Sequence, residues 1–410
     1  MTATDLPPGA TARRTTTEPP PRGTTVRPSG AAAGPPTVDV PSGAGAAPTA
    51  AAVMDRVREY ASGLPARASE IERLGRVPGD VLDGLKATGL LRAALPPSRG
   101  GVELTVPHIT RAIDELATGD ASVGWCAAVA LNASLAVVRL RAHAYTELFP
   151  DPDLITATVL PPTGQGTRGD GGYLLSGRWT HASGITHADR VMAGFRTPQG
   201  VPRVAVFDAA HARVMDTWNT TGLRGTGSHD IEVAGLFVPE RHTFGLAPSA
   251  DRQDPPHLRA DNLALKMAGV PLGIARSALS AAREILAARR PALPRPASPA
   301  DLARAESLIG AADAYVYNTL EDAWAAQEAD RTPERGTAAL ARQFAHRACR
   351  EAVQLLYDAV GSAAVYTERT PLDRCLRDVI TASRHVASAE GVLDAVGDLR
   401  LGGDPASPHL

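Results

Sequence analysis

The amino-acid sequence predicts a mainly α-helical protein with a central β domain. Apolar residues recur at helical spacing from Ala51 to about residue 150. Short β-like runs separated by Gly, Pro and Asp clusters then occupy residues 151–256, at intervals typical of an antiparallel barrel or sandwich. Helical spacing returns after His257. The predicted order is therefore an N-terminal helical domain, a small β domain and a C-terminal four-helix bundle.

Proline content sets the first domain boundary. Residues 1–50 carry ten prolines and no large apolar cluster, so this segment cannot bury enough surface to offset the entropy of ordering it. We expect a disordered Pro/Ala/Thr-rich tail there. A helical domain at 51–150, a β domain at 151–256, a helical bundle at 257–400 and a flexible tail at 401–410 are expected to follow.

The individual elements follow from apolar periodicity and from the residues that begin and end helices. Gly119 and Asp120 are predicted to stop one helix and to cap the next. The predicted helices are Ala51–Leu64, Asp80–Leu91, Val106–Ala117, Ala121–Leu148, Leu258–Arg290, Asp301–Asp330, Arg335–Val360 and Leu372–Leu399. The predicted strands are Leu154–Leu160, Tyr173–Ser176, Arg190–Phe195, Val204–Asp208 and Ile231–Val238. In the last helix Val379, Val386 and Leu393 recur every seven residues, which predicts one continuous buried face.

Composition excludes several classes of partner. The chain has 410 residues, 44% apolar and 21% charged, with a net charge of −2, which is an ordinary globular composition. The near-neutral balance gives no electrostatic footprint for nucleic acid. No run approaches the roughly 18 consecutive apolar residues that a membrane span needs. We therefore expect neither a nucleic-acid nor a membrane partner.

The cysteine and histidine patterns argue against a disulfide framework and against a metal site. The three cysteines, Cys126, Cys349 and Cys375, are odd in number and widely spaced. They are typical of buried or idle thiols in a reducing cytoplasm, where we expect the protein to reside. His181 and His187 stand six residues apart, with no cysteine or carboxylate at ligand spacing. We therefore expect no bound metal.

Two glycine-containing segments can approach a ligand closely. Gly222–Ser228 reads Gly-Leu-Arg-Gly-Thr-Gly-Ser and leads directly into a predicted strand, which suits an anionic or ring-shaped cofactor. Trp179–Asp189 surrounds Ser183 with small residues, so a ring could pack on its backbone while the hydroxyl bonds the edge of the ring. The alternatives are an ordinary Gly-rich hairpin connection for the first segment and a surface turn for the second.

Two further residues could take part in chemistry. His385 could act as a general acid or base, or it could simply be satisfied in helix packing. Trp125 opens an apolar helix and could line a pocket or belong to the core. A Walker A motif, a Rossmann fingerprint and a Gly-x-Ser-x-Gly elbow are all missing from the sequence. Standard nucleotide hydrolysis, Rossmann dinucleotide binding and α/β-hydrolase chemistry are therefore not expected.

Taken together, the motifs resemble the acyl-CoA dehydrogenase fold, and more specifically the flavin-dependent monooxygenases built on it. Examples are p-hydroxyphenylacetate hydroxylase and dibenzothiophene monooxygenase, the oxygenase components of two-component systems. The resemblance covers about residues 53–400. Its motifs are Ala94–Gly101, Asp120–Trp125, Ser176–Gly184, Gly222–Ser228, Val238-Pro239 and Arg377-Asp378 through His385. It implies an N-terminal helical domain, a small antiparallel β-barrel and a C-terminal four-helix bundle.

This resemblance implies that a reduced flavin, FMNH2 or FADH2, sits between the β domain and the helices. Ser183 would lie near the flavin N5 edge, and Trp125 would line the pocket. The Gly222–Ser228 loop would touch the ring or the ribityl chain, and the residues of this loop implied in binding are Arg224, Gly225 and Thr226. Thr158 and Arg276 are further candidate cofactor-binding residues.

Three departures separate the sequence from particular members of the family. His385 falls near where the dehydrogenases carry a catalytic glutamate, and no carboxylate occupies 384–387. An Arg-x-Gln-Phe-Gly segment, expected after the helix with Arg276, is replaced by Ala288–Leu293. Related phenol hydroxylases carry a histidine about two helical turns after the position of Trp125, and Asn132 stands in that neighbourhood here. Asn132 can orient a substrate or a water, but it cannot act as a base near neutral pH.

The implied activity is a two-component monooxygenase reaction. A separate reductase would supply the reduced flavin, which reacts with O2 to give a C4a-hydroperoxide. One oxygen atom would then enter a small organic substrate, aromatic or polycyclic, in secondary metabolism or aromatic catabolism. His385, Ser183 and Asn132 are the implied catalytic residues, and a homotetramer is the implied assembly. The alternatives are an FAD-dependent acyl-CoA dehydrogenase-type oxidoreductase and a helical binding or scaffolding protein that has lost flavin chemistry.

Overall fold

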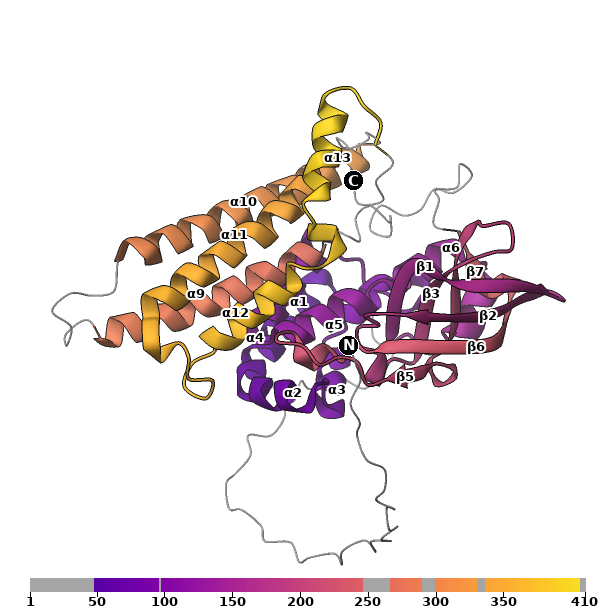
Figure 1. Cartoon of the computed structure of the whole chain (residues 1–410), viewed down its shortest axis with the longest axis horizontal. Helices are drawn as coiled ribbons and strands as arrows, with labels where there is room; N and C mark the ends of the chain where they lie inside the picture. Colours follow the sequence, from indigo (N-terminus) through magenta and orange to yellow (C-terminus); the bar gives the residue numbers. More distant parts are fainter. Residues whose placement is uncertain (1–47, 96, 246–265, 290–298, 330–335, 406–410) are drawn as a thin grey trace, which may run out of the picture. The chain divides into compact units, whose positions relative to one another are not determined.

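The computed structural model describes residues 48–95, 97–245, 266–289, 299–329 and 336–405. Within these ranges the chain runs from helices through one sheet to a second set of helices (Figure 1). This is the mainly α organisation with a central sheet that the sequence predicts. Most of the predicted N-terminal tail and the loop predicted to close the β domain near Pro256 lie outside the described residues, as does the start of the helix predicted from Leu258.

The N-terminal helices begin at residues whose side chains satisfy free backbone N–H groups. Thr49, Thr105 and Asp120 cap α1, α4 and α5 in this way, and the predicted cap at Asp120 is therefore confirmed. The bounds are α1 Ala50–Gly63, α2 Ala68–Leu74, α3 Gly79–Ala87, α4 Val106–Gly119, α5 Ala121–Ala130, α6 Ala133–Arg139 and α7 Ala142–Leu148.

The helix predicted over Ala121–Leu148 is divided into α5, α6 and α7. The segment is apolar on most sides, so periodicity carries no signal for where the helix breaks. Among the described residues, 121–139 is the one helical stretch that is long and apolar enough to cross a membrane by length and composition. Most of this stretch is buried inside the protein. Such burial is typical of a core helix, and the interior around α5 is where the layers meet.

The β domain is one seven-stranded sheet in the order β5-β6-β2-β1-β3-β4-β7. Within the described residues five of its six strand pairs are antiparallel, and β1 and β3 run parallel. The prediction of a strictly antiparallel sheet is therefore wrong for the β1–β3 pair. Among the described strands, β5 and β7 stand at opposite ends of the sheet and do not pair to close a barrel. The bounds are β1 Thr156–Gly169, β2 Gly172–Trp179, β3 Arg190–Arg196, β4 Pro202–Asp208, β5 Arg213–Met215, β6 Asp230–Pro239 and β7 Thr243–Phe244.

The C-terminal helices are α9 Gly269–Arg289, α10 Pro299–Glu328, α11 Thr337–Val360, α12 Leu372–Ala382 and α13 Gly391–Arg400. The single helix predicted over Leu372–Leu399 is wrong, because the chain turns between α12 and α13. Val379 is fully buried, but Val386 is 53% and Leu393 39% exposed. A heptad repeat that crosses a break does not stay on one side, so the predicted continuous buried face does not form.

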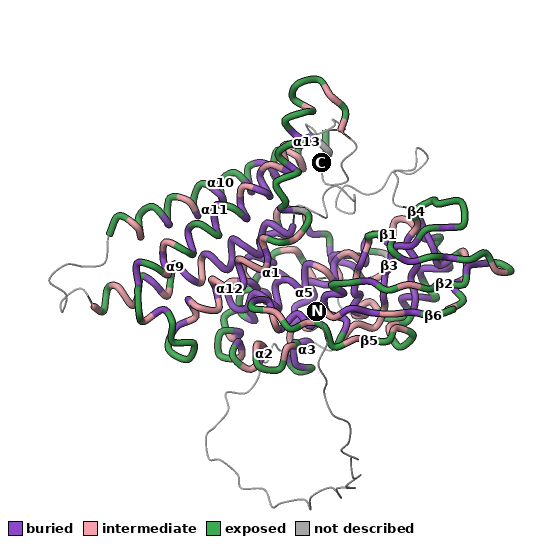
Figure 2. The backbone as a smooth tube through the Cα atoms, viewed as in Figure 1, coloured by how far each residue is buried: buried purple, intermediate pink, exposed green. Residues whose placement is uncertain are grey.

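The N-terminal helices connect the sheet to the C-terminal helices. α4 packs against α9, and α5 contacts both α9 and β1. Figure 1 shows these violet helices between the magenta sheet and the orange and yellow helices. Buried residues gather along α5, α9 and α11, where the layers meet (Figure 2). Any ligand held between sheet and helices would therefore lie against α5.

Trp179 fixes the packing within the sheet. Its side chain is fully buried, and its indole N–H donates to the Gly194 carbonyl at 2.6 Å. Gly164 lies against the ring, where an added Cβ would stand 2.2 Å from Trp179 Cζ2. A residue with a side chain at this position would have to displace either the indole or the strand.

We expect Gly164→Ala to destabilise the protein by about 1–3 kcal/mol, because the added methyl overpacks the Trp179 ring. Gly310→Ala is the matched control, since Gly310 is in α10 with open space around it. The control should stabilise the protein by about 0.5–1 kcal/mol through helix propensity. Chemical denaturation of both variants measures this. Equal stability of the two variants would contradict the packing described for Trp179.

Candidate active site

A chain of buried polar side chains joins α5 to the β domain. The Trp125 indole N–H donates to Ser183 Oγ at 3.0 Å, and Ser183 Oγ lies 2.7 Å from Ser228 Oγ. Ser228 Oγ in turn lies 2.6 Å from Thr226 Oγ1, which donates to the Leu223 carbonyl at 2.8 Å. All four of these side chains are at least nine-tenths buried. The two glycine-containing segments singled out in the sequence therefore meet here.

One arrangement of the protons satisfies every contact in this chain. Each hydroxyl has a single proton to donate. If Thr226 donates to the Leu223 carbonyl, which also accepts from the Trp218 indole and the Thr226 N–H, then Ser228 donates to Thr226 and Ser183 donates to Ser228. Ser183 Oγ already accepts from Trp125. In this arrangement, Ser183 can act toward any further group only as an acceptor.

Backbone hydrogen bonds hold the same two segments together. Gly184 N–H donates to the Thr226 carbonyl at 2.8 Å, and Ala182 N–H donates to the His229 carbonyl at 3.0 Å. Ser183 is thus fixed on both sides by main-chain bonds to the loop that carries Ser228. Its hydroxyl is positioned by backbone geometry rather than by side-chain packing alone.

Helix α12 clamps the Gly222–Ser228 loop. Leu223 takes a left-handed backbone conformation with φ 51°, and its N–H donates to Asp378 Oδ1 at 2.6 Å. Gly222 packs so tightly on α12 that an added Cβ would stand 2.1 Å from the Arg377 carbonyl oxygen. On the far side of the loop, a Cβ on Gly225 would lie 2.2 Å from Ile71 Cγ2. Only glycine fits at either position.

Asp378 is a buried carboxylate with a strongly altered titration. Burial, helped by the Asp120 carboxylate, raises the pKa of Asp378 to about 7, and the hydrogen bond from Leu223 opposes the shift. Beside it, Arg377 bonds Glu72 at 2.5 Å and the Thr221 carbonyl at 2.6 Å. The dipeptide Arg377-Asp378 thus ties α12 to both α2 and the loop.

His385 lies in the turn after α12 and packs edge-on against Trp125, with ring centroids 5.4 Å apart. His346 of α11 is nearby and is 2% exposed, and no described group hydrogen-bonds its Nδ1. Burial lowers the pKa of His346 to about 3, with His385 and Arg342 contributing in the same direction. His346 is therefore neutral near pH 7. The structure thus brings together Trp125, Ser183 and His385, three of the predicted site residues.

Asn132 has a partner that the sequence did not reveal. Lys266 Nζ donates to Asn132 Oδ1 at 2.7 Å. Lys266 is 1% exposed, and burial lowers its pKa to about 7. Only one signal could have singled it out: the chain has just two lysines, Lys86 and Lys266. His346 was likewise missed, because nothing local distinguishes it, whereas Ser228 was included as the end of the Gly222–Ser228 loop.

The remaining predicted residues occupy different environments. Thr158 Oγ1 in β1 is buried, and no described group hydrogen-bonds it. Arg224 donates to the Thr220 carbonyl at 2.9 Å, inside its own loop. Arg276 bonds Asp114 and Asp313, at the junction of α4, α9 and α10. These partners of Arg276 do not belong to the Trp125–Ser183 cluster, and its cofactor-binding role stays a prediction.

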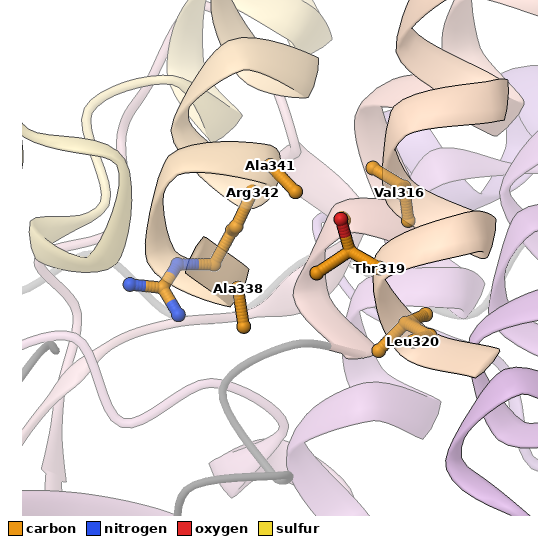
Figure 3. Close-up of a pocket in the computed structure, with 7 residues that line it drawn as sticks. Val316, Thr319, Leu320, Ala338, Ala341 and Arg342 are labelled. Atoms are coloured by element: carbon orange, nitrogen blue, oxygen red, sulfur yellow. The ribbon is translucent and has the colours of Figure 1, made fainter. Parts of the chain in front are cut away.

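The described helices enclose a small cavity and border a larger groove. The small cavity, of about 10 Å³, is lined by Ala268, Arg342 and side chains of α10 and α11, and such a volume holds about one water. Figure 3 shows the Arg342 guanidinium extending away from the α10 side chains. A groove of about 360 Å³ is lined by Arg289, Arg369 and Tyr366 among others. The described residues hold no group of His, Cys, Asp and Glu suited to a metal, and the three cysteines are buried free thiols.

Comparison with known proteins identifies the family. Models of the acyl-CoA dehydrogenase N-terminal and C-terminal domains match residues 47–145 and 265–390. Indole-3-acetate monooxygenase from Pseudomonas putida is 31% identical over 88% of this chain and 96% of the relative. The chain belongs to the acyl-CoA dehydrogenase family. Within that family it is a flavin-dependent monooxygenase, of the type that serves as an oxygenase component.

Other relatives agree with this assignment. The oxygenase component of p-hydroxyphenylacetate 3-hydroxylase from Acinetobacter baumannii is 25% identical over 81% of this chain and 85% of the relative. The FADH2-dependent resorcinol hydroxylase oxygenase component from Rhizobium is 26% identical over 87% of this chain and 96% of the relative. The crystal structure of 3-HSA hydroxylase from Rhodococcus sp. RHA1 has a TM-score of 0.81 and 25% identity, covering 88% of this chain and 99% of that one.

The burial of Asp378 generates a prediction about pH. The folded protein keeps a proton on Asp378 up to about pH 7, whereas the unfolded chain releases it near pH 4. Stability should therefore fall as pH rises between these values, relative to Asp378→Asn, which cannot ionise. Denaturant titrations of both proteins over this range measure the difference. Parallel curves would contradict a raised Asp378 pKa.

The same side chain tests the clamp on the loop. Asp378→Asn keeps an acceptor for the Leu223 N–H, while Asp378→Ala leaves that buried donor unsatisfied. We expect only the alanine variant to lose about 1–3 kcal/mol of unfolding free energy at low pH, where Asp378 is protonated. If the two variants were equally stable there, the hydrogen bond would not hold the loop.

Proposed function

We propose that this protein inserts one oxygen atom from O2 into an aromatic substrate, using reduced flavin that a separate reductase delivers. The reductase is inferred from the relatives that are named oxygenase components. The substrate class is inferred from relatives named for indole-3-acetate and p-hydroxyphenylacetate, both of which are arylacetic acids. A homotetramer in the cytoplasm remains our expectation for the assembly and its location.

The observation that carries this proposal is the buried hydroxyl chain at Ser183, taken with Thr226 donating to the Leu223 carbonyl. If the flavin N5 edge faces Ser183, the acceptor there suits the N5–H of a reduced flavin. An oxidised flavin has no hydrogen on N5 and would need a donor, which Ser183 cannot supply while it donates to Ser228. The pocket is therefore suited to reduced flavin. The buried, unpartnered Thr158 Oγ1 offers a further polar group on the sheet side.

The flavin, when bound, supplies the oxygen chemistry. The chain's own residues orient the ring and exclude water. Trp125 and the clamped loop provide rigid, buried walls, since water entry would divert the oxygen to H2O2. His385, packed on Trp125, provides an imidazole that can hold or transfer a proton at the reacting oxygen. Positions 384–387 offer no carboxylate to take an α-proton from an acyl thioester, which disfavours the dehydrogenase alternative.

Ser228→Ala should reduce the preference for reduced flavin. Without Ser228 the Ser183 proton is free to rotate toward N5 and to donate to oxidised flavin. We expect the ratio of the Kd for oxidised flavin to the Kd for reduced flavin to fall by about threefold to tenfold, which corresponds to the free energy of one hydrogen bond. Ser134→Ala is the control, because that buried hydroxyl bonds the Leu131 carbonyl elsewhere. Anaerobic titration with FMN and FAD in both redox states gives the four constants. An unchanged ratio would contradict the assigned direction.

His385→Ala should fold but uncouple the reaction. We expect oxygenated product to fall by about a hundredfold or more, as for loss of a general acid or base, with the electrons recovered as H2O2. His385→Asn should behave similarly, since it restores polarity but supplies no group that gains or loses a proton near neutral pH. The measurement compares product with H2O2 per reduced flavin consumed, with an arylacetic acid as substrate. Wild-type coupling in His385→Ala would rule out this role.

A further inference from the structure

Lys266 is a buried amine that hydrogen-bonds one side chain, Asn132, among the described residues. It opens the short 3-10 turn Lys266–Ala268 before α9 and is 1% exposed. An ammonium group carries three donors, and the recorded bond to Asn132 Oδ1 uses one of them. Within the described ranges, no carboxylate forms an ion pair with Lys266, and burial alone accounts for its lowered pKa. A buried amine of this kind is stabilised by an anion that approaches its free donors.

Asn132 relates Lys266 to the active site. Asn132 lies in the turn between α5 and α6, where its N–H donates to the Val129 carbonyl and its carbonyl accepts from the Leu135 N–H. It follows Trp125 of α5 by seven residues, a separation of about 10 Å at the helical rise per residue. That span is comparable to the length of an arylacetic acid.

Basic side chains also lie on α11, which contacts the turn that carries Lys266. Ala268, two residues after Lys266, lines the same small cavity as Arg342 of α11. His346 lies one helical turn beyond Arg342 and is influenced by both Arg342 and His385. The side chains of Arg342, His346 and His385 are therefore near one another. The lining of the cavity contains no acidic residue.

We propose that Lys266, held in place by Asn132, binds the carboxylate of an arylacetic acid substrate, while the aromatic ring lies toward Trp125 and His385. The inference rests on the proposed function and narrows its substrate class to anionic aromatics. It also gives Asn132 a positioning role: its side-chain oxygen fixes the amine and leaves the remaining donors for the substrate. Asn132 therefore acts through Lys266 rather than on the reacting atoms.

Two matched pairs of probes test this proposal. Indole-3-acetate differs from 3-methylindole, and p-hydroxyphenylacetate from p-cresol, only by the carboxylate. Equilibrium binding of each probe is measured on the full chain with reduced flavin under anaerobic conditions. We expect wild type to bind at least one acid more tightly than its neutral partner, by about tenfold or more. Lys266→Met should remove that preference and leave the neutral probes unchanged, while Lys266→Arg should keep part of it.

Controls separate the possible outcomes. Lys86→Met changes the other lysine and should leave all constants as in wild type, and thermal unfolding checks that Lys266→Met is folded. Equal binding of acid and neutral probes by wild type, or binding of neither acid, would overturn the proposal. A loss of reduced-flavin affinity in Lys266→Met, with equal effects on acid and neutral probes, would also overturn it. Failure of the proposed function is seen separately, as absence of protein-dependent oxygen reactivity of the reduced flavin.

Discussion

The site depends on one constraint: buried hydroxyls must satisfy one another. Trp125 comes from α5, Ser183 from the β domain and Ser228 from the loop that α12 clamps, and their bonds form a single directed chain. A buried polar group without a partner costs free energy, so none of these elements can shift alone. When Thr226 donates to the Leu223 carbonyl, the same constraint leaves Ser183 as an acceptor.

Helix α12 couples this chain to His385. Its Asp378 holds the Leu223 N–H, and the turn after its last residue carries His385 onto Trp125. A shift of α12 would therefore move the loop and the imidazole together. The short helix, rather than a longer continuous one, is what allows His385 to leave the helical path and face α5. Stability and catalytic geometry thus share one element.

Much of the fold could be predicted, because α1, α4 and β6 carry clear periods and end signals. The site could be predicted only in part: Ser183 and Gly222–Ser228 stand in small-residue segments that local sequence reveals. Lys266 could not be paired with Asn132, since 134 positions separate them and only tertiary packing joins them. The break after α12 was missed because the apolar heptad continued across it, although Val386 is exposed.

The most direct test of the account is a stopped-flow absorbance experiment. The protein with anaerobically reduced FMN or FAD is mixed with oxygenated buffer, and the absorbance of the flavin is followed. If the site protects the reduced flavin as it reacts with oxygen, a transient distinct from both reduced and oxidised flavin should appear. It should be missing without protein and should show which flavin is used. Direct reoxidation at the rate of free flavin, with tightly bound oxidised FAD in the purified protein, would contradict the account and favour a dehydrogenase.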